Sequence, residues 1–161
     1  EKMGAGVIWK NITKECGELT GDVQIYSQPL NGIDFTAEMI PGVIDEIPII
    51  AILATQADSP TIVSGAEELR VKECDRIKAI CSNLKSMGAE VIETRDGFII
   101  NPVNRLQNTT IKTFGDHRIA MAFTVAGLIN PEPNILDDPD CINISFPEFN
   151  VNLRQLLIAE S

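Results

Sequence analysis

The sequence lacks the residue patterns of several common kinds of functional site. Its four cysteines form no CxxC pair, its single histidine has no second ligand at metal spacing, and no GxGxxG, P-loop or HExxH motif occurs. No serine stands in a nucleophile-elbow pattern. We therefore expect no metal, no cofactor and no Ser-His-Asp triad, and the scattered cysteines favour reduced thiols in a cytoplasmic protein.

Basic residues are also scarce, at 13 Lys and Arg against 23 Asp and Glu, which gives a net charge of −10. Such a charge repels nucleic acid and anionic membrane surfaces, so we expect neither as a partner. Apolar runs such as residues 47–57 and 119–129 are interrupted by Pro48, Thr55, Thr124 and Gly127. They also fall short of the ~20 residues that span a bilayer. An anionic ligand would have to be held by a local cluster of Lys and Arg.

What the chain does contain suffices for one compact domain. It has 161 residues, of which 44% are hydrophobic, enough to bury a real core. It opens with the residues EKMG, without an initiator Met and without the layout of a signal peptide. We expect the chain to be a piece of a longer protein.

An internal repeat runs through the chain. Residues 3–8 (MGAGVI) recur in similar form at residues 87–92 (MGAEVI). The residue pairs at 44–45 and 115–116 each open an Ala-rich apolar segment, and each segment is followed by a proline and a short apolar strand. This order predicts two copies of one α/β unit, roughly residues 1–84 and 85–161.

The hydrophobic pattern predicts the elements of these units. We expect helices at residues 45–57, 73–87, 116–128 and 148–158; the second is amphipathic and stops at Gly88, whereas the first and third are apolar nearly all round and should be buried. Strands are predicted at residues 22–26, 61–63, 68–71, 91–94, 98–101, 109–113, 134–136 and 142–144. Residues 95–97 (RDG) indicate a hairpin turn in which Asp-Gly supplies positive φ. The predicted fold class is α/β, with buried helices covered by mixed sheets.

Charged residues gather at three predicted helix starts. Asp45, Asp75 and Asp116 each precede a helix, where a carboxylate commonly caps the free N–H groups. Arg76 and Arg118 oppose the helix dipole at the same places. Either they form salt bridges within the protein, or they hold a phosphate or carboxylate ligand together with the helix N-terminus.

His117, the only histidine, lies between Asp116 and Arg118. It is either an acid or base, or a hydrogen-bonded structural residue. Residues alone do not decide between these interpretations.

Two longer motifs resemble a known family. Residues 68–77 (ELRVKECDRI) and 115–122 (GDHRIAMA), together with residues 44–48 (IDEIP) and 145–149 (SFPEF), are similar to EPSP synthases. The resemblance covers essentially the whole chain. It implies βαβαββ units, three in each of two domains, with substrates bound between the domains; this chain resembles the last two units of the second domain.

The resemblance also implies an activity, the transfer of the enolpyruvyl group from phosphoenolpyruvate to the 5-hydroxyl of shikimate 3-phosphate, as a step of chorismate and aromatic amino acid biosynthesis. By the family pattern, Arg76 and Arg118 hold phosphoenolpyruvate and Lys72 lies near shikimate 3-phosphate. Asp45 contacts the attacking hydroxyl and Glu73 lies near the methylene carbon, so these two are the candidate acid and base. His117 lies beside them. The partners implied are the two substrates and the N-terminal domain of the same enzyme, without which this chain should be inactive.

The sequence departs from the family at two positions. Cys74 stands where the family usually has Ser or Thr, and Ile144 stands where some members carry a Lys that binds phosphoenolpyruvate. Two alternatives stay open: a related enolpyruvyl transferase acting on UDP-N-acetylglucosamine, and a non-catalytic folded module whose charged helix starts are only caps and salt bridges.

Overall fold

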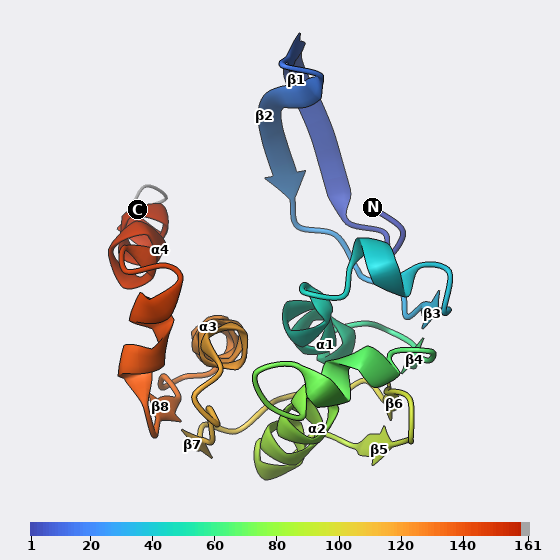
Figure 1. The fold of residues 1–161 in the computed structure, drawn as a ribbon, viewed down its shortest axis with the longest axis vertical. Helices are drawn as coiled ribbons and strands as arrows, with labels where there is room; N and C mark the ends of the chain where they lie inside the picture. The colour runs from blue at the N-terminus through green and yellow to red at the C-terminus, as the bar shows by residue number, and fades with distance from the viewer. Residues whose placement is uncertain (159–161) are drawn as a thin grey trace.

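Three predicted helices lie next to one another at the centre of the fold (Figure 1). The computed structural model describes residues 1–158, and it places these helices at α1 (Ile47–Thr55), α2 (Arg76–Ser86) and α3 (His117–Ala126). Each begins one to three residues later than predicted. Ile47, Ala51, Ile80 and Phe123 are among their fully buried side chains. The prediction that the first and third are buried helices is confirmed.

Short strands cover these helices in mixed sheets. One sheet has the order β3 (Asp34–Phe35), β4 (Thr61–Val63), β6 (Phe98–Ile100) and β5 (Val91–Glu93). In it β3 and β4 are parallel, whereas β4–β6 and β5–β6 are antiparallel. A second, parallel pair joins β7 (Thr110–Ile111) and β8 (Ile135–Leu136). The α/β class with buried helices under mixed sheets is therefore confirmed.

Both parallel pairs are connected in the same way. The chain passes from β3 through α1 to β4, and from β7 through α3 to β8, so each crossover is a buried helix. After β4 the chain continues through α2 into the β5–β6 hairpin, which completes the order β-α-β-α-β-β from Asp34 to Ile100. The boundary predicted at residues 84 and 85 falls inside α2.

The repeated MGA segments adopt the same local structure. Gly4 and Gly88 have φ of 87° and 84°, and each is followed by the first strand of an antiparallel hairpin. At Gly88 this conformation ends α2: Gly88 N donates to Lys85 O and Ala89 N donates to Leu84 O, as in a Schellman motif. The predicted stop at Gly88 is confirmed.

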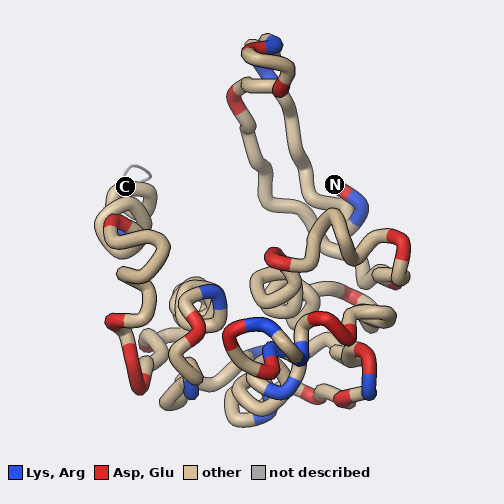
Figure 2. The backbone as a smooth tube through the Cα atoms, viewed as in Figure 1, with Lys and Arg blue, Asp and Glu red and all other residues tan. Residues whose placement is uncertain are grey.

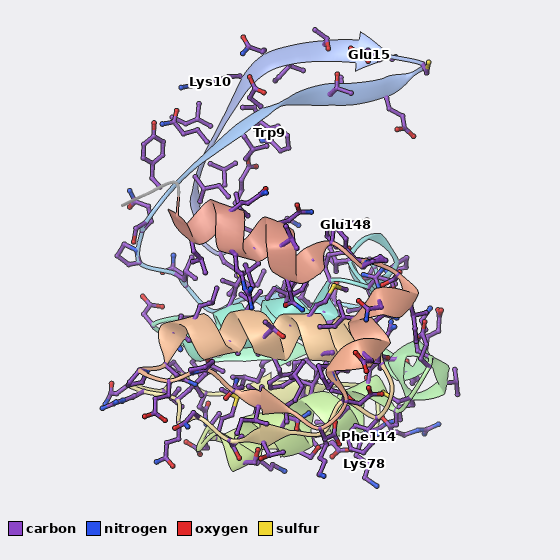
Figure 3. All side chains as sticks on the ribbon, turned by 90° about the vertical axis from the view of Figure 1, so that its left-hand side faces the viewer. Trp9, Lys10, Glu15, Lys78, Phe114 and Glu148 are labelled. Carbon is purple, nitrogen blue, oxygen red and sulfur yellow. The ribbon has the colours of Figure 1, made fainter. Side chains whose placement is uncertain are left out.

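A long hairpin projects from the body (Figures 1 and 3). It consists of β1 (Gly6–Glu15) and β2 (Glu18–Tyr26), so the predicted strand at 22–26 is longer than expected and its partner was missed. Trp9 lies opposite Val23, beside the pair formed by Val7 and Ile25. Trp9 and Ile25 are 56% and 71% exposed, so one face of the hairpin presents apolar side chains to solvent.

Two predicted strands are wrong. Residues 67–71 form the 3-10 helix η2 (Glu67–Val71), because Leu69 N donates back to Ala66 O while the Leu69 side chain enters the core. Residues 139–144 form the 3-10 helix η4 (Pro139–Ile144), whose first residue is a proline with the fixed φ that a helical turn accepts.

The turn at residues 95–97 joins β5 and β6 as predicted, but not through positive φ, which neither Asp96 nor Gly97 adopts. Gly97 is required there by close packing, since a Cβ would lie 1.9 Å from Val63 O.

Shorter elements complete the chain. The 3-10 helix η1 (Ile40–Gly42) precedes α1, and η3 (Gly127–Ile129) continues α3. The predicted last helix is present as α4 (Phe149–Ile158). Among residues 1–158, no helix has both the length and the apolar character needed to cross a membrane.

Candidate functional site

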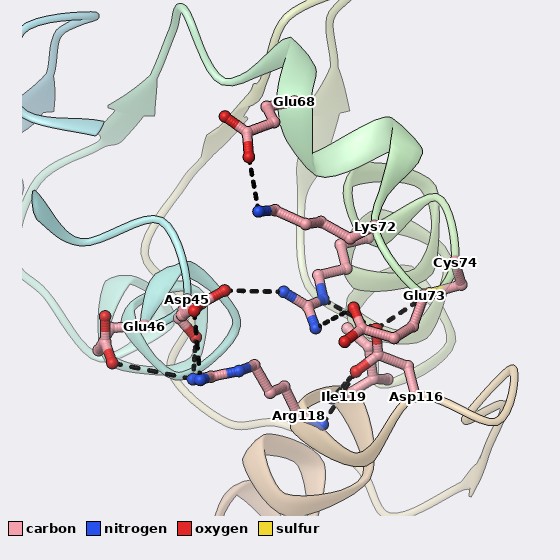
Figure 4. Close-up of polar contacts among 10 residues, drawn as sticks. Asp45, Glu46, Glu68, Lys72, Glu73, Cys74, Asp116, Arg118 and Ile119 are labelled. Carbon is pink, nitrogen blue, oxygen red and sulfur yellow. Dashed lines mark hydrogen bonds and ion pairs between the residues drawn. The ribbon is translucent and has the colours of Figure 1, made fainter. Parts of the chain in front are cut away.

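The N-terminal ends of α1, α2 and α3 meet at one cluster of charged side chains (Figure 4). Asp45 lies in the turn before α1, Glu73 in the segment before α2, and Asp116 at the N-cap of α3. Figure 2 shows acidic and basic residues side by side along the loop that leads into α2. The helix starts singled out in the sequence therefore come together in space.

Arg76 is the centre of this cluster. It is the first residue of α2, and only 1% of its side chain is exposed. Its Nε donates to Asp116 Oδ2 at 2.8 Å, its Nη1 to Asp45 Oδ1 at 3.1 Å, and its Nη2 to Glu73 Oε2 at 2.6 Å. Every guanidinium nitrogen thus faces a carboxylate, which offsets the unfavourable position of a cation at a helix N-terminus.

Asp45 connects Arg76 to Arg118. Its Oδ2 lies 3.3 Å from Arg118 Nη2, while its Oδ1 accepts from Arg76. Arg118 Nη1 also donates to the backbone oxygen of Asp45 at 3.0 Å and lies 3.8 Å from Glu46 Oε1. The Arg118 side chain remains 34% exposed, so it is the more accessible of the two arginine side chains.

Asp116 has two roles. Its Oδ1 caps α3 by accepting from the backbone N–H groups of Arg118 and Ile119, and its Oδ2 accepts from Arg76. Burial acts to raise the pKa of Asp116, but the hydrogen bond and charge of Arg76 and the two N–H groups outweigh it and hold this pKa below its ordinary value. The ionised form is therefore the one that the fold favours.

The Cys74 thiol donates to the same carboxylate oxygen of Asp116, at 3.6 Å. Burial, together with the charge of Asp116, raises the pKa of Cys74 to about 12. Cys74 is therefore a neutral hydrogen-bond donor at neutral pH, the part that the hydroxyl of Ser or Thr can also play.

Of the three expected helix caps, two are present. Asp75 Oδ1 accepts from Lys78 N at the start of α2, and Asp116 caps α3. The expectation is wrong for Asp45, because the N-cap of α1 is Glu46, which makes no side-chain cap. The Asp45 carboxylate instead pairs with Arg76 and Arg118.

The remaining predicted residues lie around this cluster. Glu73 is half exposed and pairs with Arg76. Lys72 Nζ lies 2.6 Å from Glu68 Oε1, an ion pair visible at the edge of the cluster in Figure 4. His117 is the first residue of α3 and is half-buried. The structure thus brings Asp45, Glu73, Arg76 and Arg118 into direct contact, with Lys72 and His117 on neighbouring segments.

The balance of charge within the cluster is negative. The guanidinium groups of Arg76 and Arg118 contact four carboxylates, those of Asp45, Glu46, Glu73 and Asp116. An anion that binds these arginines must displace at least one carboxylate or bring further cations with it.

A groove of about 230 Å³ runs between α1 and α3 from this cluster. Apart from Asp45, Glu46 and Arg118 at its charged end, its walls are apolar, formed in part by Ile49, Met121 and Phe149. Only the charged end suits an anionic ligand. Within residues 1–158, no group of three or more His, Cys, Asp or Glu side chains is placed to hold a metal ion.

Comparison with solved structures defines the class of protein. Two structures of EPSP synthase from Acinetobacter baumannii match with TM-scores of 0.86 and 0.87 at 36% and 33% identity, covering 92% and 96% of this chain and 35% and 36% of theirs. The enolpyruvyl transferase NikO from Streptomyces tendae matches with a TM-score of 0.67 at 21% identity, over 96% of this chain and 33% of that one. The fold is that of enolpyruvyl transferases.

Sequence comparison then gives the family. A family model described as EPSP synthase (3-phosphoshikimate 1-carboxyvinyltransferase) matches residues 1–153. Proteins named 3-phosphoshikimate 1-carboxyvinyltransferase are 46% identical in Oceanobacillus iheyensis and 42% identical in a Sulfurihydrogenibium species, each over 97% of this chain. The chain belongs to the EPSP synthase family. It spans about a third of the length of these relatives, 36% in both cases.

Sequence reasoning missed two features of the site. Asp116 was interpreted only as a cap, although its second oxygen binds the buried Arg76. Glu46 was not singled out as a partner of Arg118. The only signal for either was their position beside predicted site residues, since contacts between separate helix starts depend on how the helices pack.

Proposed function

We propose that, within its parent protein, this chain supplies part of the active site that transfers the enolpyruvyl group from phosphoenolpyruvate to the 5-hydroxyl of shikimate 3-phosphate. The observation that carries the proposal is the bridge that Asp45 makes between Arg76 and Arg118. It joins two cations and an exposed carboxylate at converging helix starts, the combination that an anionic substrate with a reacting hydroxyl requires.

Arg118 and Arg76 are proposed to hold the anionic groups of phosphoenolpyruvate. Arg118 is the first contact, because about a third of its side chain is exposed. Arg76 is enclosed by carboxylates, so a ligand reaches it only by replacing Asp45 or Glu73. Lys72, whose ion pair with Glu68 lies at the edge of the cluster, is proposed to bind the phosphate of shikimate 3-phosphate.

Asp45 and Glu73 are the proposed acid and base. The reaction needs one group to accept the proton of the attacking hydroxyl and another to protonate the methylene carbon. In the later elimination the second group takes a proton back from that carbon, and the first gives its proton to the leaving phosphate. Both carboxylates are substantially exposed, at 43% and 49%, and can exchange protons with a substrate once released from Arg76. His117, at the start of α3, is proposed to bind substrate beside them.

The rest of the parent protein is the proposed partner of this chain. Chains of this family are about three times longer, and the exposed apolar face of the β1–β2 hairpin has the character of a surface that packs against further chain. That remainder would bring the cations that the acidic cluster lacks. We propose that one βαβαββ unit begins at β3 and the next at β7. The β1–β2 hairpin would then be the end of a preceding unit.

We propose the cytoplasm as the location of the parent protein. Free cysteines at positions 16, 74, 81 and 141 suit the reducing cytoplasm. The proposed reaction uses no cofactor, because addition and elimination at phosphoenolpyruvate require only proton transfers and charge stabilisation.

Release of phosphate from phosphoenolpyruvate in the presence of shikimate 3-phosphate tests the proposal. The complete parent protein should turn over at a rate typical of enzymes, about 1–10³ per second, and the 161-residue chain should not, because it offers only part of the substrate contacts. Replacing shikimate 3-phosphate by UDP-N-acetylglucosamine should abolish turnover. Activity of the parent with the nucleotide sugar alone would overturn the proposal, and so would failure of both substrates to bind the parent in calorimetric titration.

A further inference from the structure

The guanidinium of Arg70, in η2, contacts four acceptors outside the cluster of charged residues. Its Nε donates to Arg95 O at 2.7 Å and its Nη2 donates to Thr94 O at 2.5 Å. Its Nη1 donates to Asp75 Oδ2 at 2.8 Å, and Nη2 also lies 3.0 Å from Glu93 Oε1. One side chain thereby joins the end of β5 to the residue that caps α2.

Asp75 passes this connection on to α2. While its Oδ2 accepts from Arg70, its Oδ1 accepts from Lys78 N in the first turn of the helix. One oxygen of the Asp75 carboxylate is thus held by Arg70, and the other caps α2. Because Arg76 directly follows Asp75, the position of this cap determines where the Arg76 side chain leaves the backbone and enters the cluster.

The β5–β6 turn that Arg70 binds is itself held by hydrogen bonds. Asp96 Oδ2 accepts from Gly65 N at 2.8 Å, and Asp96 O accepts from Ala66 N at 2.7 Å, immediately before η2. The 3-10 helix η2 is therefore bound to the β5–β6 turn at both ends, by Asp96 at its start and by Arg70 near its finish.

The segment between these anchors carries site residues, and its backbone has little support of its own. Residues 72–75 belong to neither a helix nor a strand, and in the described part of the chain none of their backbone N–H groups donates a hydrogen bond. Lys72 and Glu73 lie in this segment. Side chains of the segment contact Glu68, Arg76 and Asp116, while its backbone is held at its two ends, by Arg70 on one side and the capped Asp75 on the other.

We propose that Arg70 is a positioning residue for the candidate site: by tying the β5–β6 turn to the N-cap of α2, it sets the placement of Lys72, Glu73 and Arg76. Its planar fork is suited to this task, because it reaches backbone and carboxylate acceptors in several directions at once. A lysine ammonium provides the charge but not that fixed geometry. The functional part of the proposal rests on the proposed enolpyruvyl transfer.

The chain offers a matched control on the same turn. Arg95 is exposed, none of its side-chain atoms contacts the candidate site, and only its backbone oxygen binds Arg70. Arg95→Gln therefore removes one positive charge from the turn and leaves the connection to Asp75 intact. Asp96→Asn is a second control, because it weakens the other anchor of the turn without touching Asp75.

The test compares these variants with Arg70→Gln and Arg70→Lys in the complete parent protein. We expect Arg70→Gln to lower kcat/KM for phosphoenolpyruvate by roughly tenfold to a hundredfold, the effect of a small misplacement of binding groups. Arg70→Lys should recover only part of that loss. Arg95→Gln should stay within about twofold of the wild type, and Asp96→Asn should lower the melting temperature as much as Arg70→Gln with a smaller loss of kcat/KM. Equal losses of kcat/KM in Arg70→Gln and Asp96→Asn, scaling with melting temperature, would overturn the proposal.

Hydrogen exchange separates this proposal from the proposed reaction. In the parent protein, Arg70→Gln should speed exchange of the amides in the first turn of α2, including Lys78 N, while Arg95→Gln should not. Unchanged exchange in Arg70→Gln would overturn the positioning role whether or not the parent shows the expected activity. Faster exchange in a parent that lacks this activity would support Arg70 as the anchor of α2 and reject the reaction alone.

Discussion

Asp116 accepts a 2.8 Å hydrogen bond from Nε of Arg76, and at most 1% of either side chain reaches solvent. This buried ion pair joins the N-terminus of α3 to that of α2. A buried pair contributes little by its formation, since desolvation opposes it, but losing one partner leaves an uncompensated charge. The pair is therefore the point at which the cluster is most sensitive to substitution.

Asp116→Asn should lower the free energy of unfolding of the chain by about 3 kcal/mol, because asparagine keeps the cap of α3 but leaves the buried Arg76 with fewer anionic partners. Urea unfolding followed by circular dichroism measures this change. Glu73→Gln is the control: its carboxylate also pairs with Arg76 but is half exposed, so its loss should cost under about 1 kcal/mol. Equal losses in the two variants would contradict the buried pair as the main contributor.

Stability should fall in acid, in part through Asp116. Its pKa is lowered in the folded chain by Arg76 and by backbone N–H groups, in spite of burial. Such a carboxyl group contributes stability above its unfolded pKa of about 3.9, and that contribution is lost as pH falls through the lower, folded value. Urea midpoints measured between about pH 2.5 and 6 should therefore decline below about pH 4, and the decline should be shallower in Asp116→Asn. Parallel curves for the two proteins would contradict this assignment.

Arg118→Ala should mainly weaken the binding of phosphoenolpyruvate by the complete parent protein. The lost charge-assisted hydrogen bonds are each worth about 1.5–3 kcal/mol, or roughly tenfold or more in affinity. Calorimetric titration measures the change directly. Arg105→Ala, which removes an exposed arginine that lines a different pocket beside Asn108 and Glu132, should leave affinity unchanged. An affinity retained in Arg118→Ala would remove this residue from the proposed binding site.

Glu73→Gln should lower turnover of the complete parent protein more than it lowers substrate affinity. Glutamine keeps the shape of the side chain and can still contact Arg76, but it cannot exchange a proton, and general acid-base catalysis typically contributes about 10²–10⁴-fold. Steady-state kinetics, with phosphoenolpyruvate varied, separate kcat from KM. If kcat is unchanged, Glu73 is not an acid or base in the reaction.

Only one of the four thiols should react readily in the folded chain. Burial raises the pKa of Cys74 and of Cys81 to about 12 and also raises that of Cys141, whereas Cys16 is exposed at the tip of the hairpin. Near pH 8 a disulfide reagent should therefore label Cys16 within seconds to minutes and the others only after unfolding in guanidinium. Cys16→Ser should abolish the fast phase. Fast labelling of Cys74 would contradict its hydrogen bond to Asp116.

Elements with a strong local signal could be predicted from the sequence. The spacing of apolar residues predicted α2, and Gly88 predicted its end, because helix periodicity and a left-handed glycine cap depend on neighbouring residues only. The β5–β6 hairpin followed from short apolar runs on either side of a turn sequence. The recurrence of the MGA segment likewise indicated two places with the same conformation.

Tertiary structure alone decided the rest. Residues 68–71 have a strand-like sequence, yet Leu69 enters the core and Arg70 binds a turn that is distant in sequence, so the 3-10 helix η2 forms instead. Asp45 looks like a helix cap in the sequence, but packing of α1 against α3 places it between two arginines. Local propensities act over a few residues, whereas ion pairs between helix starts depend on the packing of whole elements. The sequence by itself therefore determined which residues stand at the helix starts, and only the fold decided which of them meet.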